Sequence, residues 1–239
     1  MSALTSYFDR AFYPELTDNW DDQFFRRAIE AKLTPDSIVL DLGAGAGIVA
    51  EMNFRGKVAR VCGVDLDPRV CDNPHLDEGL IADGGSIPYD DDTFDVIFAD
   101  NVMEHIADPA AIYGEVWRTL KPGGIFLFKT PNKTHYMPTI ARITPHSFHE
   151  FVNNLRGRKE IDTFPTLYRT NTASSIQYWA QRTGFVDCRV RRIEGRPEYL
   201  RINSLLYAFG ILYERIVNCA RLLEPFRILI IAEMKKPQG

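Results

Sequence analysis

The chain has 239 residues, a length typical of one domain with some additions. Its composition, 45% hydrophobic and 25% charged, is that of an ordinary globular protein and excludes a disordered or fibrous chain. The net charge of −4 disfavours nucleic acid as a partner, because domains that bind it usually carry a basic face. The four cysteines lack the paired spacing of a zinc site, so we expect free thiols and no bound metal.

The first twenty residues lack the basic, apolar and small-residue order of a secretory signal. Further along, no run reaches the roughly 20 apolar residues of a membrane-spanning helix. The longest candidate, residues 202–213, contains Asn203 and Ser204 and is followed by Glu214 and Arg215. We therefore expect a cytoplasmic protein without stable membrane insertion.

Helix and strand signals alternate through the first hundred residues. Residues 20–32 carry apolar side chains at helical spacing. The run SIVLDL at 37–42 is typical of a buried strand, and the GAGAG that follows leads into a predicted helix over 48–52. Further strands are predicted over residues 58–65, 78–83 and 94–100.

In the second half, Asp108 and Pro109 have the types favoured at the N-cap and first position of a helix, here predicted over 110–120. Residues 131–170 hold three of the five histidines and little periodicity, which indicates an irregular insertion with short helices. The remaining predicted elements are a tight turn at 121–124, a strand over 125–130, a capped helix that ends at Gly184, an alternating strand over 186–193, a helix over 205–223 and a strand over 226–235.

This order of elements predicts an α/β fold with a doubly wound, mostly parallel sheet and helices on both faces. In such sheets, ligands bind beyond the carboxyl ends of the strands. The segment DLGAGAG, residues 41–47, lies at such an end. Its glycines permit a tight turn and let a ligand approach bare backbone, and a helix that begins there attracts an anionic group. A dinucleotide site of the form GxGxxG would need glycine where this chain has Ile48.

The form GxGxG, with an acid two residues before its first glycine, resembles the first motif of class I S-adenosylmethionine-dependent methyltransferases. IPYDDDTFD, VMEHIADP and LKPGG follow in order, so residues 34–129 resemble the type 11 subgroup. The resemblance implies a Rossmann-like sheet of seven strands with an antiparallel last strand, in a single domain. The predicted segments of that domain are an N-terminal helical cap (1–35), a cofactor-binding core (36–131), an acceptor-side insertion (132–170) and a C-terminal helix and strand part (171–239).

The resemblance also implies S-adenosylmethionine as the cofactor and S-adenosylhomocysteine as its product. By position, Asp65 holds the ribose hydroxyls and Leu66 packs on the adenine. Asp83, followed by Gly84, contacts the adenine amino group. The other residues matched to cofactor binding are Asp41, Gly43, Ala44, Gly45 and Gly47 in the glycine segment, and Asp100 and Asn101 beside the methionine arm. Whether Asp41 touches the ligand or bonds loop amides stays open.

The expected reaction is methyl transfer to a small-molecule acceptor, with O-methylation of a hydroxylated metabolite or sugar favoured. Histidines follow two predicted strands, and a histidine can accept a hydroxyl proton near neutral pH. C- or N-methylation, and a non-catalytic protein that binds the cofactor, are the alternatives, and a nicotinamide-dependent dehydrogenase is disfavoured by Ile48. The candidate bases are His135, His105 and Tyr136, followed by His146 and His149.

Three further features concern surfaces. Five arginines lie within residues 189–201, and Arg189 and Arg191 alternate on the outward face of a strand, where charge protects a sheet edge. Binding of an anionic acceptor is the alternative role for this cluster. Tyr7 and Tyr13 are predicted to pack in the core, with closure over the cofactor as the alternative. The aromatic-rich segment 205–223 is predicted to be core or a homodimer face rather than a membrane-surface helix.

Overall fold

The computed structural model describes residues 2–143 and 165–238, and only the backbone of residues 140–143. Close packing divides the chain into two compact units. Unit 1 contains the described parts of Met1–Trp20, Pro131–Pro165 and Arg192–Leu229. Unit 2 contains Asp21–Thr130, Thr166–Arg191 and the described part of Ile230–Gly239. The predicted division into a cap, a core, an insertion and a C-terminal part remains a prediction.

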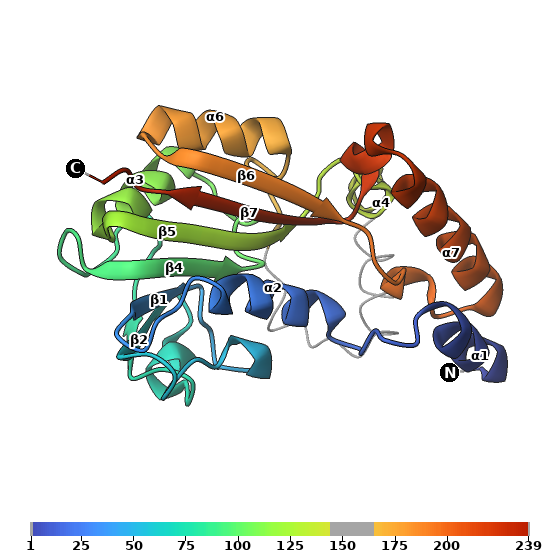
Figure 1. Cartoon of the computed structure of the whole chain (residues 1–239), viewed down its shortest axis with the longest axis horizontal. Helices are drawn as coiled ribbons and strands as arrows, with labels where there is room; N and C mark the ends of the chain where they lie inside the picture. Colours follow the sequence, from blue (N-terminus) through green and yellow to red (C-terminus); the bar gives the residue numbers. More distant parts are fainter. Residues whose placement is uncertain (1, 144–164, 239) are drawn as a thin grey trace. The chain divides into compact units, whose positions relative to one another are not determined.

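A seven-stranded sheet forms the framework of the fold (Figure 1), as the sequence predicts. Its strand order is β3-β2-β1-β4-β5-β7-β6. The pairs β3–β2, β2–β1, β1–β4 and β4–β5 are parallel, and β7 runs antiparallel to its neighbours. The strands are β1 (Ile38–Leu42), β2 (Arg60–Asp65), β3 (Glu78–Ile81), β4 (Phe94–Asp100), β5 (Leu120–Pro131), β6 (Val186–Ile193) and β7 (Leu229–Lys235).

Helices of unit 2 cover both faces of the central strands. Side chains alternate between the faces of a strand. Ile97 of β4 therefore joins the core that α3 (Pro109–Thr119) and α6 (Ala173–Thr183) share. The neighbouring Phe98 contacts the ring of Phe25 from α2 (Trp20–Glu30), with 6.4 Å between ring centroids, on the opposite face. Burial on both faces explains why residues 38–40 of β1 and 96–99 of β4 are continuous apolar runs in the sequence.

The predicted helix caps of α3 and α6 are present. Asp108 accepts hydrogen bonds from the backbone N–H groups of Ala110 and Ala111, and Pro109 occupies the first turn. Thr172 and Ser175 form a reciprocal capping box at the start of α6. Gly184 ends α6 in the left-handed region at φ 99°, which glycine adopts without steric cost.

The helix predicted over residues 48–52 is wrong. The chain forms only a single 3₁₀ turn, η1 (Ala50–Met52). Val49 before it is extended, with φ −88° and ψ 99°, and offers no side-chain cap to the turn's N–H groups. The glycine segment therefore leads into a bend rather than a helix N-terminus, so no helix dipole acts there on an anionic group.

The turn predicted over residues 121–124 lies within β5 as a bulge. The pairing jumps from Phe94 opposite Leu120 to Val96 opposite Ile125. Gly123, at φ 82°, donates its N–H to the carbonyl of Lys236, with 3.1 Å between the two atoms. β5 thus continues through residues 121–124 because the backbone near Lys236 forms hydrogen bonds with them.

Unit 1 is mainly helical. Its core is an apolar cluster of Tyr13, Tyr207 and Ile211, and the Tyr207 hydroxyl donates to Asp9 Oδ1 at 2.6 Å. Within residues 2–143 and 165–238, no helix is long and apolar enough to cross a membrane. The elements of unit 1 are α1 (Ala3–Phe12), α4 (Tyr136–Ile143), η4 (Glu198–Leu200), α7 (Ser204–Cys219) and η5 (Arg221–Phe226); η2 (Pro68–Asp72) belongs to unit 2.

Candidate functional site

Three carboxylates lie at one edge of the sheet in unit 2. Asp41 is in β1, and Asp65 and Asp100 end β2 and β4, the strands on either side of it. Because the three strands are parallel, their carboxyl ends meet. Burial raises the pKa of Asp41 well above its usual value, and the charges of Asp100 and Asp65 raise it further. This edge is therefore an anionic site that favours a cation.

A glycine bend lies against these acids. Gly43, Gly45 and Gly47 all have positive φ, at 82°, 50° and 70°. A Cβ on Gly43 would lie 2.2 Å from Cγ2 of Val102, whereas a Cβ on Gly45 would meet Asp65 Oδ2 only at 3.8 Å. The Gly43 N–H is bonded to the carbonyl of Val64 at 2.8 Å, which fixes the bend onto β2. A ligand could therefore approach the backbone closely at Gly45, whereas the side chain of Val102 covers Gly43.

Asn73, which the sequence analysis did not single out, supports the bend. Its Nδ2 donates to the carbonyls of Ala44 and Gly45, at 3.0 and 3.2 Å, and its Oδ1 accepts from the N–H of His75. A Cβ on Gly47 would lie 2.3 Å from Asn73 Oδ1, so the close approach of Asn73 requires a glycine here. No spacing rule connects a residue 26 positions beyond Gly47 with the bend, so the sequence carried no signal for this contact.

The carboxylate of Asp65 bonds two backbone amides. Oδ2 accepts from Gly45 and Oδ1 from Asp67, both at 2.8 Å. A carboxylate has about four lone-pair positions, so two acceptor positions remain. Leu66, next in the chain, is 67% exposed. An acceptor beside an exposed apolar side chain suits a ligand with a hydroxylated part and a flat apolar part.

The loop after β3 brings the next two predicted residues to this edge. Ala82 donates its N–H to the carbonyl of Asp65 at 3.0 Å, which places Asp83 directly beyond that pairing. Asp83 is exposed, and its Oδ1 accepts from the N–H of Gly85 at 3.0 Å. A Cβ on Gly84 would lie 3.1 Å from Cδ1 of Ile112, so this glycine packs closely on α3.

Lys129, near the end of β5, is a site residue that sequence reasoning missed. Its buried ammonium lies 2.9 Å from Asp100 Oδ1 and 3.2 Å from Asp21 Oδ2, and it also contacts Asp22. Burial lowers the pKa of Lys129, but the three carboxylates outweigh burial and raise it, so the lysine stays charged. The available signals were a lysine inside the apolar run IFLFKT and the acid pair that begins α2.

Asp100 combines an ion pair with an unused acceptor atom. Burial raises its pKa to about 6, although Lys129 lowers it. Within the described part of the chain, Oδ2 is buried without a hydrogen-bond partner. Asn101, at φ 53°, donates from Nδ2 to the other oxygen at 3.0 Å. A buried acceptor of this kind is costly unless something supplies a donor.

His105 and Glu104 follow β4 in unit 2. Glu104 is almost completely buried, accepts from Thr130 Oγ1 at 2.8 Å, and has a pKa raised mainly by burial. His105 Nε2 lies 4.0 Å from Glu104 Oε1, and the imidazole is 28% exposed. The pair therefore joins a partly accessible imidazole to a buried carboxyl group.

His135 and Tyr136 lie in unit 1, at the start of α4. His135 is only 1% exposed. Its Nδ1 accepts from the N–H of Met137 at 3.1 Å, and its Nε2 lies 3.6 Å from Glu194 Oε2. The ring of Tyr136 packs on His135 with 4.0 Å between centroids, and burial raises its pKa above the ordinary phenol value. His146 and His149, with residues 144–164 of the predicted insertion, lie outside the described residues.

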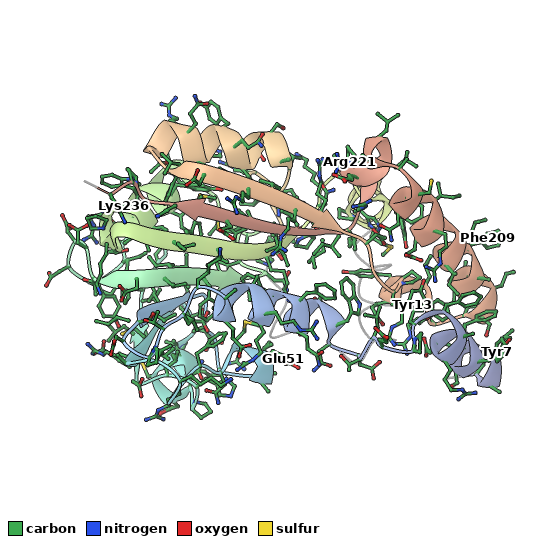
Figure 2. All side chains as sticks on the ribbon, viewed as in Figure 1. Tyr7, Tyr13, Glu51, Phe209, Arg221 and Lys236 are labelled. Atoms are coloured by element: carbon green, nitrogen blue, oxygen red, sulfur yellow. The ribbon has the colours of Figure 1, made fainter. Side chains whose placement is uncertain are left out.

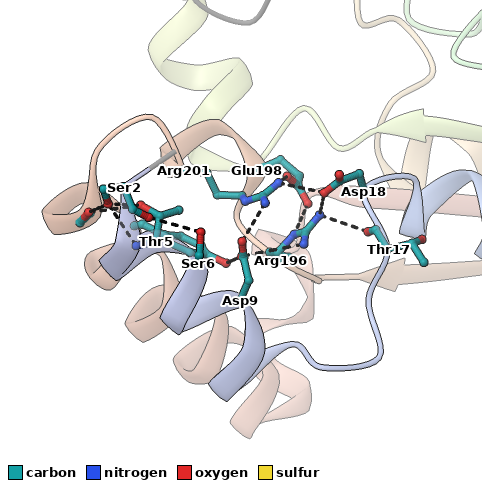
Figure 3. Close-up of polar contacts among 11 residues, drawn as sticks. Ser2, Thr5, Ser6, Asp9, Thr17, Asp18, Arg196, Glu198 and Arg201 are labelled. Carbon is teal, nitrogen blue, oxygen red and sulfur yellow. Dashed lines mark hydrogen bonds and ion pairs between the residues drawn. The ribbon is translucent and has the colours of Figure 1, made fainter.

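The arginine cluster divides into two parts. Arg189 and Arg191 are exposed on β6, the edge strand of the sheet, as predicted. Arg196 is buried in unit 1, where it bonds Asp18 Oδ1 at 2.8 Å and Glu198 Oε1 at 2.5 Å (Figure 3). Arg201 bonds Asp9, Asp18 and Glu198 in the same network. Through Asp9 and Asp18, these two arginines bind the N-terminal segment to the region before α7. The sequence did not predict this role.

The N-terminal tyrosines differ in burial. Tyr13 is buried beside Tyr207, and its hydroxyl donates to Glu214 Oε2 at 3.2 Å. Tyr7 is exposed on α1. The expectation of core packing is therefore right for Tyr13 and wrong for Tyr7, because Tyr7 lies on the outer face of α1.

Residues 40–128 match the type 11 methyltransferase domain family. The matched stretch runs from β1 to β5 and contains the glycine bend and the carboxylates of the sheet edge. The sheet has the strand order and the antiparallel strand of class I methyltransferases. Over this stretch, somewhat more than a third of the chain, the protein is similar to a methyltransferase domain. Every residue predicted for the cofactor lies within this domain, and so does His105, whereas His135 and Tyr136 lie beyond its matched boundary.

Curated relatives of the methyltransferase domain include a probable S-adenosylmethionine-dependent methyltransferase of Mycolicibacterium smegmatis. It is 34% identical over 119 residues, which cover 46% of this chain and 44% of the relative. A ubiquinone biosynthesis O-methyltransferase of Burkholderia ambifaria is 31% identical over 134 residues, which cover 49% and 57%. The chain thus spans about half the length of the curated relatives that it matches.

Among solved structures, the chain is similar to phosphoethanolamine N-methyltransferase 2 of Haemonchus contortus, in complex with phosphomonomethylethanolamine and S-adenosylhomocysteine. The TM-score is 0.57 at 17% identity, and the match covers all of this chain and 61% of the other. At this identity the likeness shows the fold alone.

Proposed function

We propose that the chain transfers the methyl group of S-adenosylmethionine to a small-molecule acceptor. The observation that carries this proposal is the set of three carboxylates, Asp41, Asp65 and Asp100, beside a bend of bare backbone. Like charges held close together raise one another's pKa, and a cation relieves that repulsion. S-adenosylmethionine carries a sulfonium and an ammonium group, so it fits an edge of this charge.

Each part of the cofactor has a suitable partner among the described residues. Asp65 has acceptor positions left for the ribose hydroxyls, and the exposed side chain of Leu66 offers a surface for the adenine. Asp83 offers an acceptor for the adenine amino group. The buried Oδ2 of Asp100, which no described group bonds, suits the ammonium of the methionine arm. Asp41 is buried within β1 and has a raised pKa, so a cation bound beside it would favour its ionised form.

When bound, S-adenosylmethionine supplies a methyl group that is already activated by its sulfonium. The work left to the protein is to hold the acceptor in line, and positioning of this kind can lower a barrier by about 7–11 kcal/mol. A general base adds about 10²–10⁴-fold when the acceptor is a hydroxyl. We propose a hydroxylated small molecule as the acceptor, in line with the O-methyltransferase among the relatives.

We propose His105 as the base that accepts the hydroxyl proton, with Glu104 to orient its ring. The accessible surface of the imidazole and the nearby buried carboxyl group support this role. His135, with Tyr136 packed against it, stays a second proposal. Because Nδ1 of His135 accepts the N–H of Met137, the neutral ring carries its proton on Nε2, and it could act as a base only through Nδ1 after that hydrogen bond breaks.

Two variants separate these candidate bases. His105→Gln should lower turnover by about 10²-fold or more while leaving the affinity for S-adenosylhomocysteine nearly unchanged, because a base acts on the acceptor rather than on the cofactor. His135→Gln is the matched substitution. Turnover and calorimetric affinity would be measured for both variants, and unchanged turnover in His105→Gln would remove that residue as the base.

The proposed function is tested by offering radiolabelled S-adenosylmethionine and a panel of hydroxylated and amine acceptors to the purified chain. We expect label in hydroxylated products. Transfer to amines alone would contradict the proposed oxygen acceptor. Binding of the cofactor with no transfer to any acceptor would instead favour a non-catalytic binding protein.

A further inference from the structure

The outer faces of α1 and α7 expose a large set of apolar side chains within unit 1. Tyr7 on α1 and Phe209 on α7 both point outwards from the helices that carry them (Figure 2). The two helices are adjacent, since the hydroxyls of Ser2 and Ser204 are 2.6 Å apart. The exposed apolar residues of this face are Leu4, Tyr7, Phe12, Leu205, Leu206, Phe209, Leu212 and Ile216.

Along α7, the exposed residues follow the spacing of a coiled coil. Leu205, Phe209, Leu212, Ile216 and Cys219 are separated by four, three, four and three positions, and all five are exposed. The opposite face of the helix is buried within unit 1. Alternating intervals of four and three place side chains on one stripe that packs against a second helix. We call these five residues the α7 seam.

The exposed apolar area is larger than a monomer usually tolerates. At about 150–200 Å² for a whole side chain of this size, the eight residues expose roughly 700 Å² per chain. Contiguous apolar patches beyond a few hundred Å² mark an interaction surface. A stable interface of standard size buries about 800 Å² on each partner, so this face would supply most of the area of one.

The charges around the face favour a protein over a lipid surface. Residues 3–12 and 204–226 contain three acidic and three arginine residues and no lysine, so these two segments together carry no net charge. Helices that bind anionic membranes are rich in Lys and Arg on their polar side. From the spacing, the area and the charge balance together, we infer that a second copy of this chain packs on the α7 seam. In such a dimer, the α7 seam of each copy packs against the α7 seam of the other, so the interface is self-complementary.

The test compares the mass of the full chain with that of two seam variants by sedimentation. Phe209→Glu and Leu212→Glu each place a carboxylate in the centre of the seam, where an interface would bury it without a partner. We expect a wild-type mass of twice the 27.3 kDa chain. Each variant should raise the dimer dissociation constant by about 30-fold or more, the effect of losing a central interface residue.

Leu222→Glu is the matched control, because Leu222 is 85% exposed in η5 but lies outside the heptad stripe. It should leave the dimer intact. Circular dichroism and thermal unfolding of all variants show whether each is folded, so that loss of the dimer is not mistaken for unfolding.

Three results would overturn the inference. They are a monomeric wild-type chain, a dimer that persists in both folded seam variants, and loss of the dimer in Leu222→Glu to the same degree. Sedimentation with phosphatidylcholine and phosphatidylserine vesicles tests the alternative that this face binds a lipid surface. A wild-type chain that is monomeric and binds vesicles through the seam would assign this face to a membrane. None of these results depends on the proposed methyl transfer.

Discussion

At the scale of single residues, the sheet edge holds one buried lysine and a larger number of carboxyl groups. Lys129 lies among Asp21, Asp22 and Asp100, whereas Asp41 interacts with Asp65 and Asp100 and forms no ion pair of its own among the described residues. Burial makes every unbalanced charge more costly. A ligand with positive groups is therefore expected to bind here with the carboxylates ionised.

This arrangement predicts a pH dependence of binding. Asp100 has a pKa of about 6, so it is mostly protonated at pH 5 in the ligand-free chain. A cationic ligand favours the ionised form, so its binding releases a proton and weakens as the pH falls through 6. For one such group, the affinity for S-adenosylmethionine should drop by about tenfold between pH 7 and pH 5.

Calorimetry at pH 5, 6 and 7 measures this dependence, and Asp100→Asn should flatten it. Constant wild-type affinity over this range would rule out Asp100 as a partner of the cation.

The stability of the ligand-free fold should depend on pH in the opposite direction to the binding affinity. A carboxyl group whose folded pKa is raised favours the fold while protonated, so the ligand-free chain should lose stability as the pH rises from about 4 through 6.

At the scale of elements, the glycine bend shows what the sequence could and could not predict. Its place after β1 followed from an apolar run and a glycine cluster, which are local signals. The helix expected after it depended on propensity over five residues, 48–52, and the extended backbone at Val49 ended that possibility. Caps such as Thr172 and Gly184 were predictable because a cap depends only on residues within a few positions of it.

The bend also gives a prediction for two of its glycines. Gly43→Ala combines φ 82° with a Cβ that would lie 2.2 Å from Val102, whereas Gly45→Ala has φ 50° and a Cβ in ordinary van der Waals contact with Asp65 Oδ2 at 3.8 Å. Left-handed backbone alone costs a side chain about 1–2 kcal/mol. Gly43→Ala should therefore lose about 2 kcal/mol or more of unfolding free energy, and Gly45→Ala about 1 kcal/mol.

Urea unfolding of both variants checks this order. Gly114→Ala is the control. Gly114 lies in α3, and no described atom lies within 4 Å of the place of its missing Cβ, so this variant should gain stability by up to about 1 kcal/mol. A Gly43→Ala chain as stable as Gly45→Ala would show that the contact with Val102 relaxes without cost.

At the scale of the whole molecule, the sheet was predictable and much of its surroundings was not. Alternation of strands and helices predicted a mostly parallel sheet, and the resemblance of the glycine segment and the motifs after it implied seven strands with an antiparallel last one, as the structure shows. Contacts such as Asn73 to the bend, or Lys129 to the acids of α2, join positions far apart in the chain and leave no periodic trace. The same holds for Arg196 and Arg201, whose ion pairs with Asp9 and Asp18 span nearly the whole sequence.

The central claim is that the acidic sheet edge binds S-adenosylmethionine and its product. Calorimetric titration of the chain with S-adenosylhomocysteine tests it most directly, with Asp65→Ala for comparison and nicotinamide adenine dinucleotide as a control ligand. We expect saturable binding of S-adenosylhomocysteine, binding weaker by roughly 1–3 kcal/mol in Asp65→Ala from the loss of a charged acceptor, and none for the dinucleotide. The claim is contradicted if the wild-type chain binds no S-adenosylhomocysteine, or if Asp65→Ala binds it with unchanged affinity.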